Sequence, residues 1–218
     1  VKTGRMYPEF SIDTHVIDPQ PIPENWLVWV GLDYNIDIAT AVFIAENPFG
    51  DLVIFDEFEG LSGNPQTNAF EILGKLNHPA NKIKIYYDSN MDNRDPLNPS
   101  RTVAQVYRDA GLRGMRTANK NRDYGVQKVK EVLEVRHDPG FRPRPKLYVM
   151  SNCSATIYGS ELNKGLMNME WEDWRYKRFD HLDDARRYAI ASRANTRFRD
   201  NVESGRPSVA HVPQWSRV

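Results

Sequence analysis

The sequence has little cysteine, no long apolar run and no net charge, and each scarcity excludes a class of protein. Its 218 residues contain one cysteine, Cys153, so a disulfide within the chain is excluded. We expect that thiol to be a small buried hydrophobic group in a reducing compartment. No apolar stretch approaches the roughly 18 residues of a membrane-spanning helix, and the N-terminus has no signal-peptide pattern. These absences favour one globular domain with a single core and no membrane partner.

Two further absences concern nucleotides and charge. The sequence contains no Gly-x-x-x-x-Gly-Lys-Ser/Thr loop, so the chain is not expected to hydrolyse ATP by that route. The formal net charge is zero, yet the charges are segregated: residues 33–95 hold 11 acidic and 4 basic residues, and residues 113–146 hold 10 basic and 4 acidic residues. An acidic region beside a basic one suits an enzyme that binds metal in one place and phosphates in another. The alternative is that both regions are solvated faces.

Two apolar runs end abruptly on a carboxylate. Residues 26–33 end on Asp33, and residues 82–88 end on Asp88. A continuous apolar run of this length is typical of a strand buried on both faces. An acid at the end of such a strand is held at the rim of the core, where its charge is usually compensated by a metal or a cationic partner. Asp37 follows shortly and is expected to lie behind the metal ligands or simply to form a turn.

A third acidic cluster begins an expected helix over residues 180–197. On an ideal helix Asp184 shares a face with Asp180 and His181, whereas Asp183 points about 100° away from Asp184 and reaches the same site only if the helix is tilted. Asp180 is expected either to support the ligands or only to cap the helix, with Asp183 at the third helical position. Two strand-end carboxylates and one helical carboxylate are what a two-metal phosphodiester-cleaving site needs.

Four basic residues lie near an expected helix over residues 123–135. Lys120 and Arg122 precede the helix in a polar loop, while Lys128 and Lys130 fall off its apolar stripe and are expected to be exposed. All four are placed to contact DNA phosphates without reading the base sequence. Plain solvent exposure is the alternative.

The order of the expected elements predicts an α/β fold with a central mixed sheet flanked by helices. Strands over residues 26–33, 40–45 and 52–58, joined by tight turns, predict an antiparallel meander. After it, strands and helices alternate. The remaining expected elements are helices over 65–76, 100–110, 123–135, 153–164 and 180–197 and strands over 83–88, 114–117 and 146–150.

The ends of the chain differ from its middle in composition. Residues 1–25 contain four prolines and are expected to be an extended lead-in or linker. Residues 26–197 form the expected domain, and residues 198–218 an Arg-rich tail. Because the first residue is not methionine and the lead-in is linker-like, we expect the chain to be part of a longer protein.

Taken together, these patterns resemble the nuclease domain of the large terminase subunit of tailed double-stranded DNA bacteriophages. The resemblance is carried by five segments, of which the last is the most specific: residues 4–10, 28–34, 86–88, 119–125 and 180–188. It implies a ribonuclease H-like fold and a metal-dependent endonuclease that cuts concatemeric viral DNA during genome packaging.

The resemblance also implies roles for individual residues. It assigns metal binding to Asp33, Asp88 and Asp184, with His181 or Asp183 as an accessory group, and two Mg²⁺ or Mn²⁺ ions when DNA is bound. The implied partners are double-stranded DNA, an N-terminal packaging ATPase domain that these 218 residues lack, the portal protein and the small terminase subunit. The implied location is the host cytoplasm.

Three alternatives stay open at this point. Another ribonuclease H-like nuclease, such as a junction resolvase or an RNA-strand nuclease, has a similar arrangement of acids. An actin- or sugar-kinase-like ATPase shares the fold but needs a Gly-rich phosphate loop, for which residues 48–50 are a poor substitute. A non-catalytic DNA-binding or motor-docking module would use the acids only to cap helices.

Overall fold

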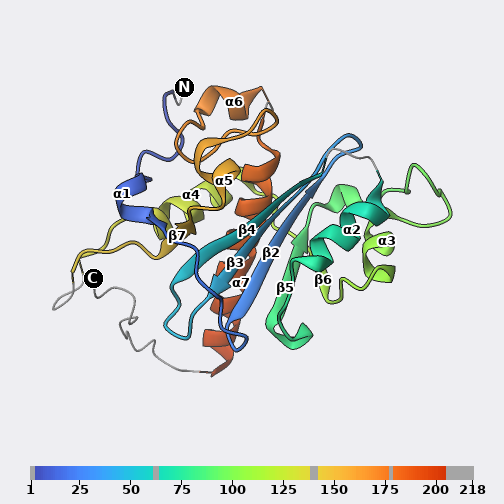
Figure 1. Cartoon of the computed structure of the whole chain (residues 1–218), viewed down its shortest axis with the longest axis horizontal. Helices are drawn as coiled ribbons and strands as arrows, with labels where there is room; N and C mark the ends of the chain where they lie inside the picture. The colour runs from blue at the N-terminus through green and yellow to red at the C-terminus, as the bar shows by residue number, and fades with distance from the viewer. Residues whose placement is uncertain (1–2, 61–63, 138–141, 177–178, 205–218) are drawn as a thin grey trace.

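A computed structural model describes residues 3–60, 64–137, 142–176 and 179–204 of the chain. Within these residues a mixed sheet of seven strands forms the centre, in the order β1-β7-β4-β3-β2-β5-β6 (Figure 1). The strands are β1 (Val16–Ile17), β2 (Leu27–Tyr34), β3 (Ala39–Glu46), β4 (Leu52–Gly60), β5 (Ile83–Tyr87), β6 (Met115–Thr117) and β7 (Leu147–Met150). The predicted meander is confirmed, because β2, β3 and β4 pair antiparallel, while all other neighbours pair parallel.

Helices cover both faces of the sheet. They are α1 (Ile12–His15), α2 (Pro65–Gly74), α3 (Val103–Asp109), α4 (Arg122–Leu133), α5 (Ser154–Tyr158), α6 (Trp171–Arg175) and α7 (His181–Ser204), with short 3₁₀ helices η1 (Ala80–Lys82) and η2 (Ser89–Asp92). Side-chain caps start several of them. At α2, α3 and α4, for example, Asn64, Thr102 and Asn121 each accept a hydrogen bond from a backbone amide in the first turn. The predicted α/β class is confirmed.

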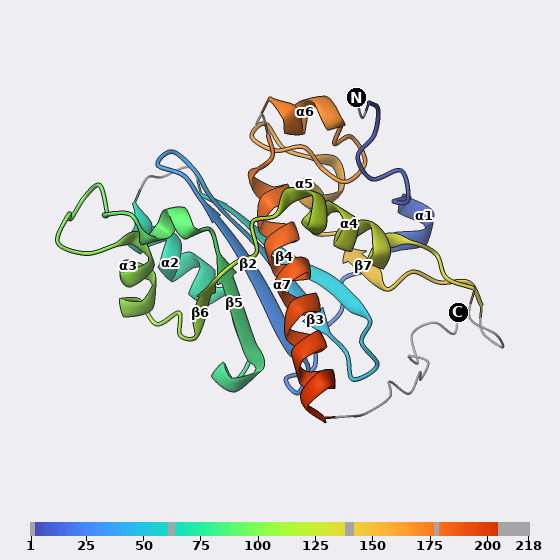
Figure 2. The same ribbon diagram turned by 180° about the vertical axis from the view of Figure 1, so that it is seen from behind.

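Alternate residues of the central strand face the two helical layers. Trp29 on β2 belongs to the core beneath α4 and α7, whereas Val28 and Val30 belong to the core beneath α2 and α3. Figure 2 shows α7 lying across β2 and β3 on the first of these faces. β2 is therefore buried on both sides, as its continuous apolar sequence predicts.

The N-terminal segment differs from the expected extended lead-in. Residues 12–15 form α1, and β1 pairs with β7 at the edge of the sheet. Met6, Tyr7 and Phe10 are buried in the core on the α4 and α7 face. The prolines shape this segment but do not keep it apart, because its large apolar side chains find places in the core.

Two helix boundaries also differ from those expected. The helix expected over 153–164 is only α5, which ends at Tyr158, because the backbone leaves the helical region at Gly159, where φ is +93°. α7 begins near the expected residue but continues to Ser204, so the first part of the expected tail is helical. The rest of the tail, residues 205–218, lies outside the described residues. None of the helices in the described ranges is long and apolar enough to cross a membrane.

Candidate active site

The candidate site begins at the carboxyl ends of two neighbouring strands. β2 and β5 pair parallel with Leu32 opposite Tyr87, and the amide of Asp88 donates a hydrogen bond to the carbonyl of Leu32 over 3.0 Å. Because neighbouring parallel strands end at the same edge of a sheet, Asp33 and Asp88 meet there. Only 6% of Asp33 and 4% of Asp88 is exposed. Two acids are thus held close together at the rim of the core.

The first turn of α7 completes the site from one face of the sheet. Gly31 permits its approach, since a Cβ atom at this position would lie 1.8 Å from the carbonyl oxygen of Ala185. Gly31 and Asp33 point to the same side of β2 because strand side chains alternate. The close contact therefore places His181 and Asp184 on the side of the sheet to which Asp33 points.

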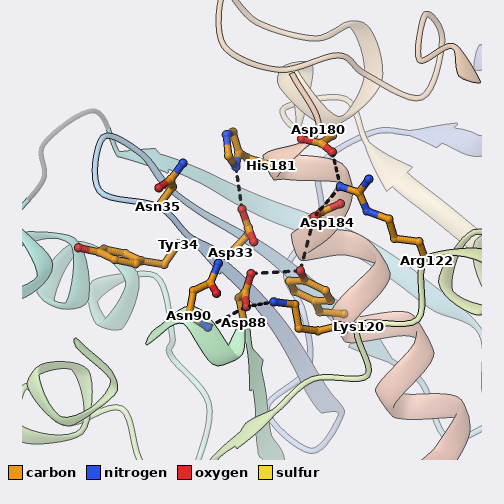
Figure 3. A pocket seen from close by; sticks show the side chains of 11 residues that line it. Asp33, Tyr34, Asn35, Asp88, Asn90, Lys120, Arg122, Asp180, His181 and Asp184 are labelled. Carbon is orange, nitrogen blue, oxygen red and sulfur yellow. Dashed lines mark hydrogen bonds and ion pairs between the residues drawn. The ribbon is translucent and has the colours of Figure 1, made fainter. Parts of the chain in front are cut away.

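These residues border one cavity of about 460 Å³ (Figure 3). Its lining comprises Asp33, Tyr34, Asn35, Asp88, Asn90, Lys120, Arg122, Asp180, His181, Asp184 and Tyr188. The structure therefore brings the three expected metal-binding aspartates together with His181, Asp180 and two of the expected DNA-binding residues.

His181 and Asp33 form a hydrogen-bonded pair. Nδ1 of His181 lies 2.8 Å from Oδ2 of Asp33, and this contact raises the pKa of the imidazole although partial burial opposes the rise. Burial raises the pKa of Asp33; His181 opposes the rise, and the neighbouring Asp88 adds to it. The pair is therefore placed to exchange a proton with a group bound in the cavity.

Two cations of the β6–α4 loop and the start of α4 contact the acids of the cavity. Nζ of Lys120 lies 2.5 Å from Oδ1 of Asp88. Nη2 of Arg122 lies 2.7 Å from Oδ2 of Asp180 and 3.8 Å from Oδ2 of Asp184. The cap at the start of α4 sets the position of both cations, which lie at the cavity rather than on a remote basic face.

Tyr188 is a residue of the cavity that the sequence analysis did not single out. Its hydroxyl lies 3.4 Å from Oδ2 of Asp88 and 3.5 Å from Oδ2 of Asp184. Burial raises the pKa of Tyr188, and the nearby Asp33 and Asp88 add to the rise, so the hydroxyl stays protonated and able to donate. Its position four residues after Asp184, one turn along the same helix face, is a signal that was available in the sequence. Tyr34, Asn35 and Asn90 carried no comparable signal.

Asp183 lies in the core rather than at the cavity. It is fully buried, accepts a hydrogen bond from the Tyr7 hydroxyl over 2.8 Å, and forms ion pairs with Arg186 and Arg187. Burial by itself would raise the pKa of Asp183, but the two arginines hold it below its ordinary value. The structure thus places Asp183 outside the cavity, which agrees with its roughly 100° separation from Asp184 on the helix.

Three other expected residues do not line the cavity. Asp37 is exposed in the turn between β2 and β3. Lys128 pairs with Glu131 at 2.7 Å, and Lys130 pairs with Glu9 at 3.4 Å. Both lysines are partly covered rather than freely exposed, because their side chains lie along neighbouring groups of the surface.

The chemistry of the cavity suits a hard divalent cation. Carboxylate oxygens are the ligands that Mg²⁺ prefers, and Asp33 and Asp88 are buried so close together that a shared dication would relieve their repulsion. In the part of the chain that the structure describes, no group of three or more His, Cys, Asp or Glu side chains is close enough to hold a metal as it stands. Asp184 is instead paired with Arg122 and Arg187. The cavity thus offers the oxygen ligands that such a metal needs, and Asp33 and Asp88 already lie close together.

Comparison with known proteins identifies the fold. No protein-family model matches the sequence, and no curated protein does. The nuclease domain of the large terminase of bacteriophage P22 aligns with a TM-score of 0.59 and 15% identity, over 88% of this chain and 93% of that chain. The large terminase nuclease domain of bacteriophage SPP1, solved with bound manganese, aligns with a TM-score of 0.52 and 14% identity, over 88% and 99%.

A longer protein matches as well. The large terminase of a thermophilic bacteriophage aligns with a TM-score of 0.60 and 19% identity, over 88% of this chain and 46% of that chain. This chain therefore spans about half the length of that terminase. At these identities the likeness establishes the fold, which is the ribonuclease H-like fold of large terminase nuclease domains.

Proposed function

We propose that this chain, which has the fold of large terminase nuclease domains, is a divalent-metal-dependent endonuclease that cuts double-stranded DNA. The observation that carries the proposal is the meeting of Asp33 and Asp88 at neighbouring strand ends, with Asp184 bordering the same cavity. Asp88 also caps η2 by accepting a hydrogen bond from the amide of Asn90 over 2.8 Å, but capping does not explain why Asp33 and Asp184 border the same cavity. The likeness to P22 and SPP1 supports the same reaction class.

The biological setting is part of this proposal. The natural substrate is concatemeric viral DNA, cut during genome packaging in the host cytoplasm. The nuclease works joined to a packaging ATPase domain, since its fold occupies about half of the large terminase of the thermophilic bacteriophage. The portal protein and the small terminase subunit are its further partners.

Asp33, Asp88 and Asp184 are the residues that would hold Mg²⁺ or Mn²⁺, with two ions proposed when DNA is bound. Bound metal supplies an activated water at neutral pH and stabilises the leaving 3′-oxygen. The manganese in the SPP1 domain supports this choice of ion. Asp180 supports the ligand set by holding Arg122 over 2.7 Å.

The other cavity residues position the substrate and move protons. His181, held by Asp33, exchanges a proton at its ring nitrogen, and the Tyr188 hydroxyl donates to a carboxylate or a phosphate oxygen. Lys120 and Arg122 bind backbone phosphates. Because they recognise charge rather than base edges, we expect no fixed cleavage sequence.

Lys128 and Lys130 are proposed to extend the phosphate-binding surface along α4. Neither lysine lines the cavity, whereas Lys120 does, so we expect a smaller contribution from them than from Lys120. A salt titration of DNA binding checks this order, because each lost phosphate contact lowers the salt dependence by about one ion.

Plasmid cleavage in Mn²⁺ tests the proposed function. Asp33→Asn, Asp88→Asn and Asp184→Asn should each lower the cleavage rate by about 10²–10⁴-fold, since each removes several kcal/mol of charge stabilisation. Asp37→Asn is the matched control, because Asp37 is an exposed acid outside the cavity, and its rate should not change.

The outcomes separate the alternatives. EDTA should abolish cutting, and duplex DNA should be cut faster than a four-way junction or an RNA–DNA hybrid. Faster cutting of the junction or the hybrid would instead identify another ribonuclease H-like nuclease. Cutting that survives in all three folded variants would show that the carboxylates are structural.

A further inference from the structure

Arg187 connects a carboxylate in the core to a carboxylate at the cavity. Its Nε donates to Oδ2 of Asp183 over 3.1 Å, and its Nη2 contacts Oδ1 of Asp184. The exposed side-chain fraction is 0% for Asp183, 1% for Arg187 and 13% for Asp184. One guanidinium group therefore reaches from the sealed interior to the edge of the proposed active site.

The N-terminal segment holds the interior end of this connection. The Tyr7 hydroxyl donates to Oδ1 of Asp183 over 2.8 Å, and the guanidinium of Arg186 lies over the Tyr7 ring at 5.4 Å. The segment is fixed in turn by a hydrogen bond of 2.8 Å from the amide of Met6 to the carbonyl of Met169. A contact between residues 176 positions apart in the chain thus sets the place of Asp183.

The Arg187 side chain is held in place by its contacts with the carboxylates of Asp183 and Asp184, because water does not reach it. Gly125 on α4 makes room for the side chain, since a Cβ atom there would lie 3.2 Å from Nη1 and 3.3 Å from Cβ of Arg187. Nη1 has no hydrogen-bond partner among the described residues. A buried donor without a partner costs free energy, so the arginine holds this place at a cost to the fold.

We propose that Tyr7, Asp183 and Arg187 are positioning residues of the active site, which hold Oδ1 of Asp184 and so present Oδ2 to the cavity. Oδ2 accordingly lies 3.5 Å from the Tyr188 hydroxyl, a group that lines the cavity. The inference rests on the proposed function, because it makes Asp184 a metal ligand through one oxygen. It also makes the N-terminal segment part of the support of the site, so a shift of this segment relative to α7 would loosen Asp184.

Mn²⁺ affinity, measured from the paramagnetic resonance signal of free Mn²⁺, tests the inference without relying on cleavage. Arg187→Lys keeps the charge but cannot span two carboxylates, and it should weaken Mn²⁺ binding about tenfold. Tyr7→Phe removes one hydroxyl and no charge, and it should weaken binding by roughly threefold. In the double variant, Tyr7→Phe should add nothing to Arg187→Lys, because both act through the same guanidinium.

Tyr107→Phe is the matched control. Tyr107 is also buried, with 1% exposed, and it forms a side-chain hydrogen bond with Asn68 on the opposite face of the sheet. Its variant should lose stability to a degree comparable with that of Tyr7→Phe and keep the wild-type affinity for Mn²⁺.

Three results would overturn the inference, and they are distinguishable. If the wild type binds Mn²⁺ and both variants bind it equally well, the positioning role is wrong while the proposed function stands. If Tyr107→Phe weakens binding as much as Tyr7→Phe, the effect is a general loosening of the fold. If the wild type binds no Mn²⁺, the proposed function itself fails and this inference falls with it.

Discussion

Asp183 and Asp184 are neighbours in the sequence but belong to two regions with opposite charge balance. In the core, one acid, Asp183, faces two arginines, and its pKa is lowered. The cavity is lined by four aspartates and by two basic side chains, Lys120 and Arg122, and burial together with the neighbouring Asp88 raises the pKa of Asp33. An acid whose charge is fully matched inside the protein supports the fold. Acids that outnumber their cations can bind a further cation, and the two cases are adjacent residues whose side chains point about 100° apart on the helix.

Removing the core acid should have the largest effect on stability. Asp183→Asn removes the carboxylate paired with buried Arg186 and leaves Arg187 with Asp184 alone, which should cost about 3–5 kcal/mol in the free energy of unfolding. Urea denaturation measures the loss. Asp184→Asn is the comparison, and it should cost no more than about 1 kcal/mol, because Arg187 retains Asp183. Equal losses in the two variants would contradict the division between core and cavity.

The close contact of α7 with the sheet joins the two regions and should be the next most sensitive feature. Gly31→Ala places a Cβ atom where the carbonyl of Ala185 lies, and overpacking of this kind typically costs about 1–3 kcal/mol. Gly74→Ala at the end of α2 has no atom within 4 Å of the new Cβ, and it should stabilise the protein by up to about 1 kcal/mol. Thermal unfolding of both variants checks the opposite signs, and a stable Gly31→Ala would refute the packing argument.

At the cavity, removing a cation should change metal binding more than stability. The Lys120 side chain is 42% exposed, so Lys120→Gln should change the free energy of unfolding by at most about 1 kcal/mol. The substitution removes the ammonium group that competes with Mn²⁺ for the Asp88 carboxylate. Two unit charges about 4 Å apart in water interact by roughly 1 kcal/mol, so Mn²⁺ should bind about fivefold tighter. Lys128→Gln, whose lysine pairs with Glu131 outside the cavity, should leave the affinity unchanged. Weaker Mn²⁺ binding by Lys120→Gln would mean that Lys120 is not a competing cation.

The smallest expected effect is that of Mn²⁺ on the reactivity of the Cys153 thiol. Cys153 lies in the same core as the buried side of α7, so its reactivity measures how closed this core is. Burial raises the pKa of its thiol, and Glu57 and Asp56 add to the rise, so the reactive thiolate is scarce. At pH 8 the native protein should react with a disulfide reagent at least about 10²-fold more slowly than the urea-unfolded protein. Mn²⁺ should not change this rate. A native thiol as reactive as the unfolded one would show that this core is open.

Features that depend on local sequence were predicted well. The strand ends at Asp33 and Asp88 follow from apolar runs that stop abruptly. The three-stranded meander follows from short turns, and the start of α4 lies one residue before the expected residue 123, at the end of a polar loop. Each of these depends on neighbours a few positions away, which the sequence displays directly.

Features that depend on distant contacts were not predicted. The pairing of β2 with β5, which brings Asp33 beside Asp88, depends on the order of strands in the sheet. Helix geometry predicted that Asp183 and Asp184 point about 100° apart. That Asp183 enters the core depends on how α7 packs against β2 at Gly31, which the sequence does not display. The prolines of the N-terminal segment suggested a linker, because nothing near Tyr7 in the sequence shows that its partner is Asp183.

The most direct test of the account is anomalous X-ray scattering from a crystal of this protein soaked in Mn²⁺. The account predicts a manganese peak in the cavity, bonded at about 2.1 Å to carboxylate oxygens of Asp33 and Asp88, with the Lys120 ammonium displaced from Asp88. Asp183 should still be paired with its two arginines. A structure with no manganese in the cavity, or with manganese bonded to Asp183, would contradict the account.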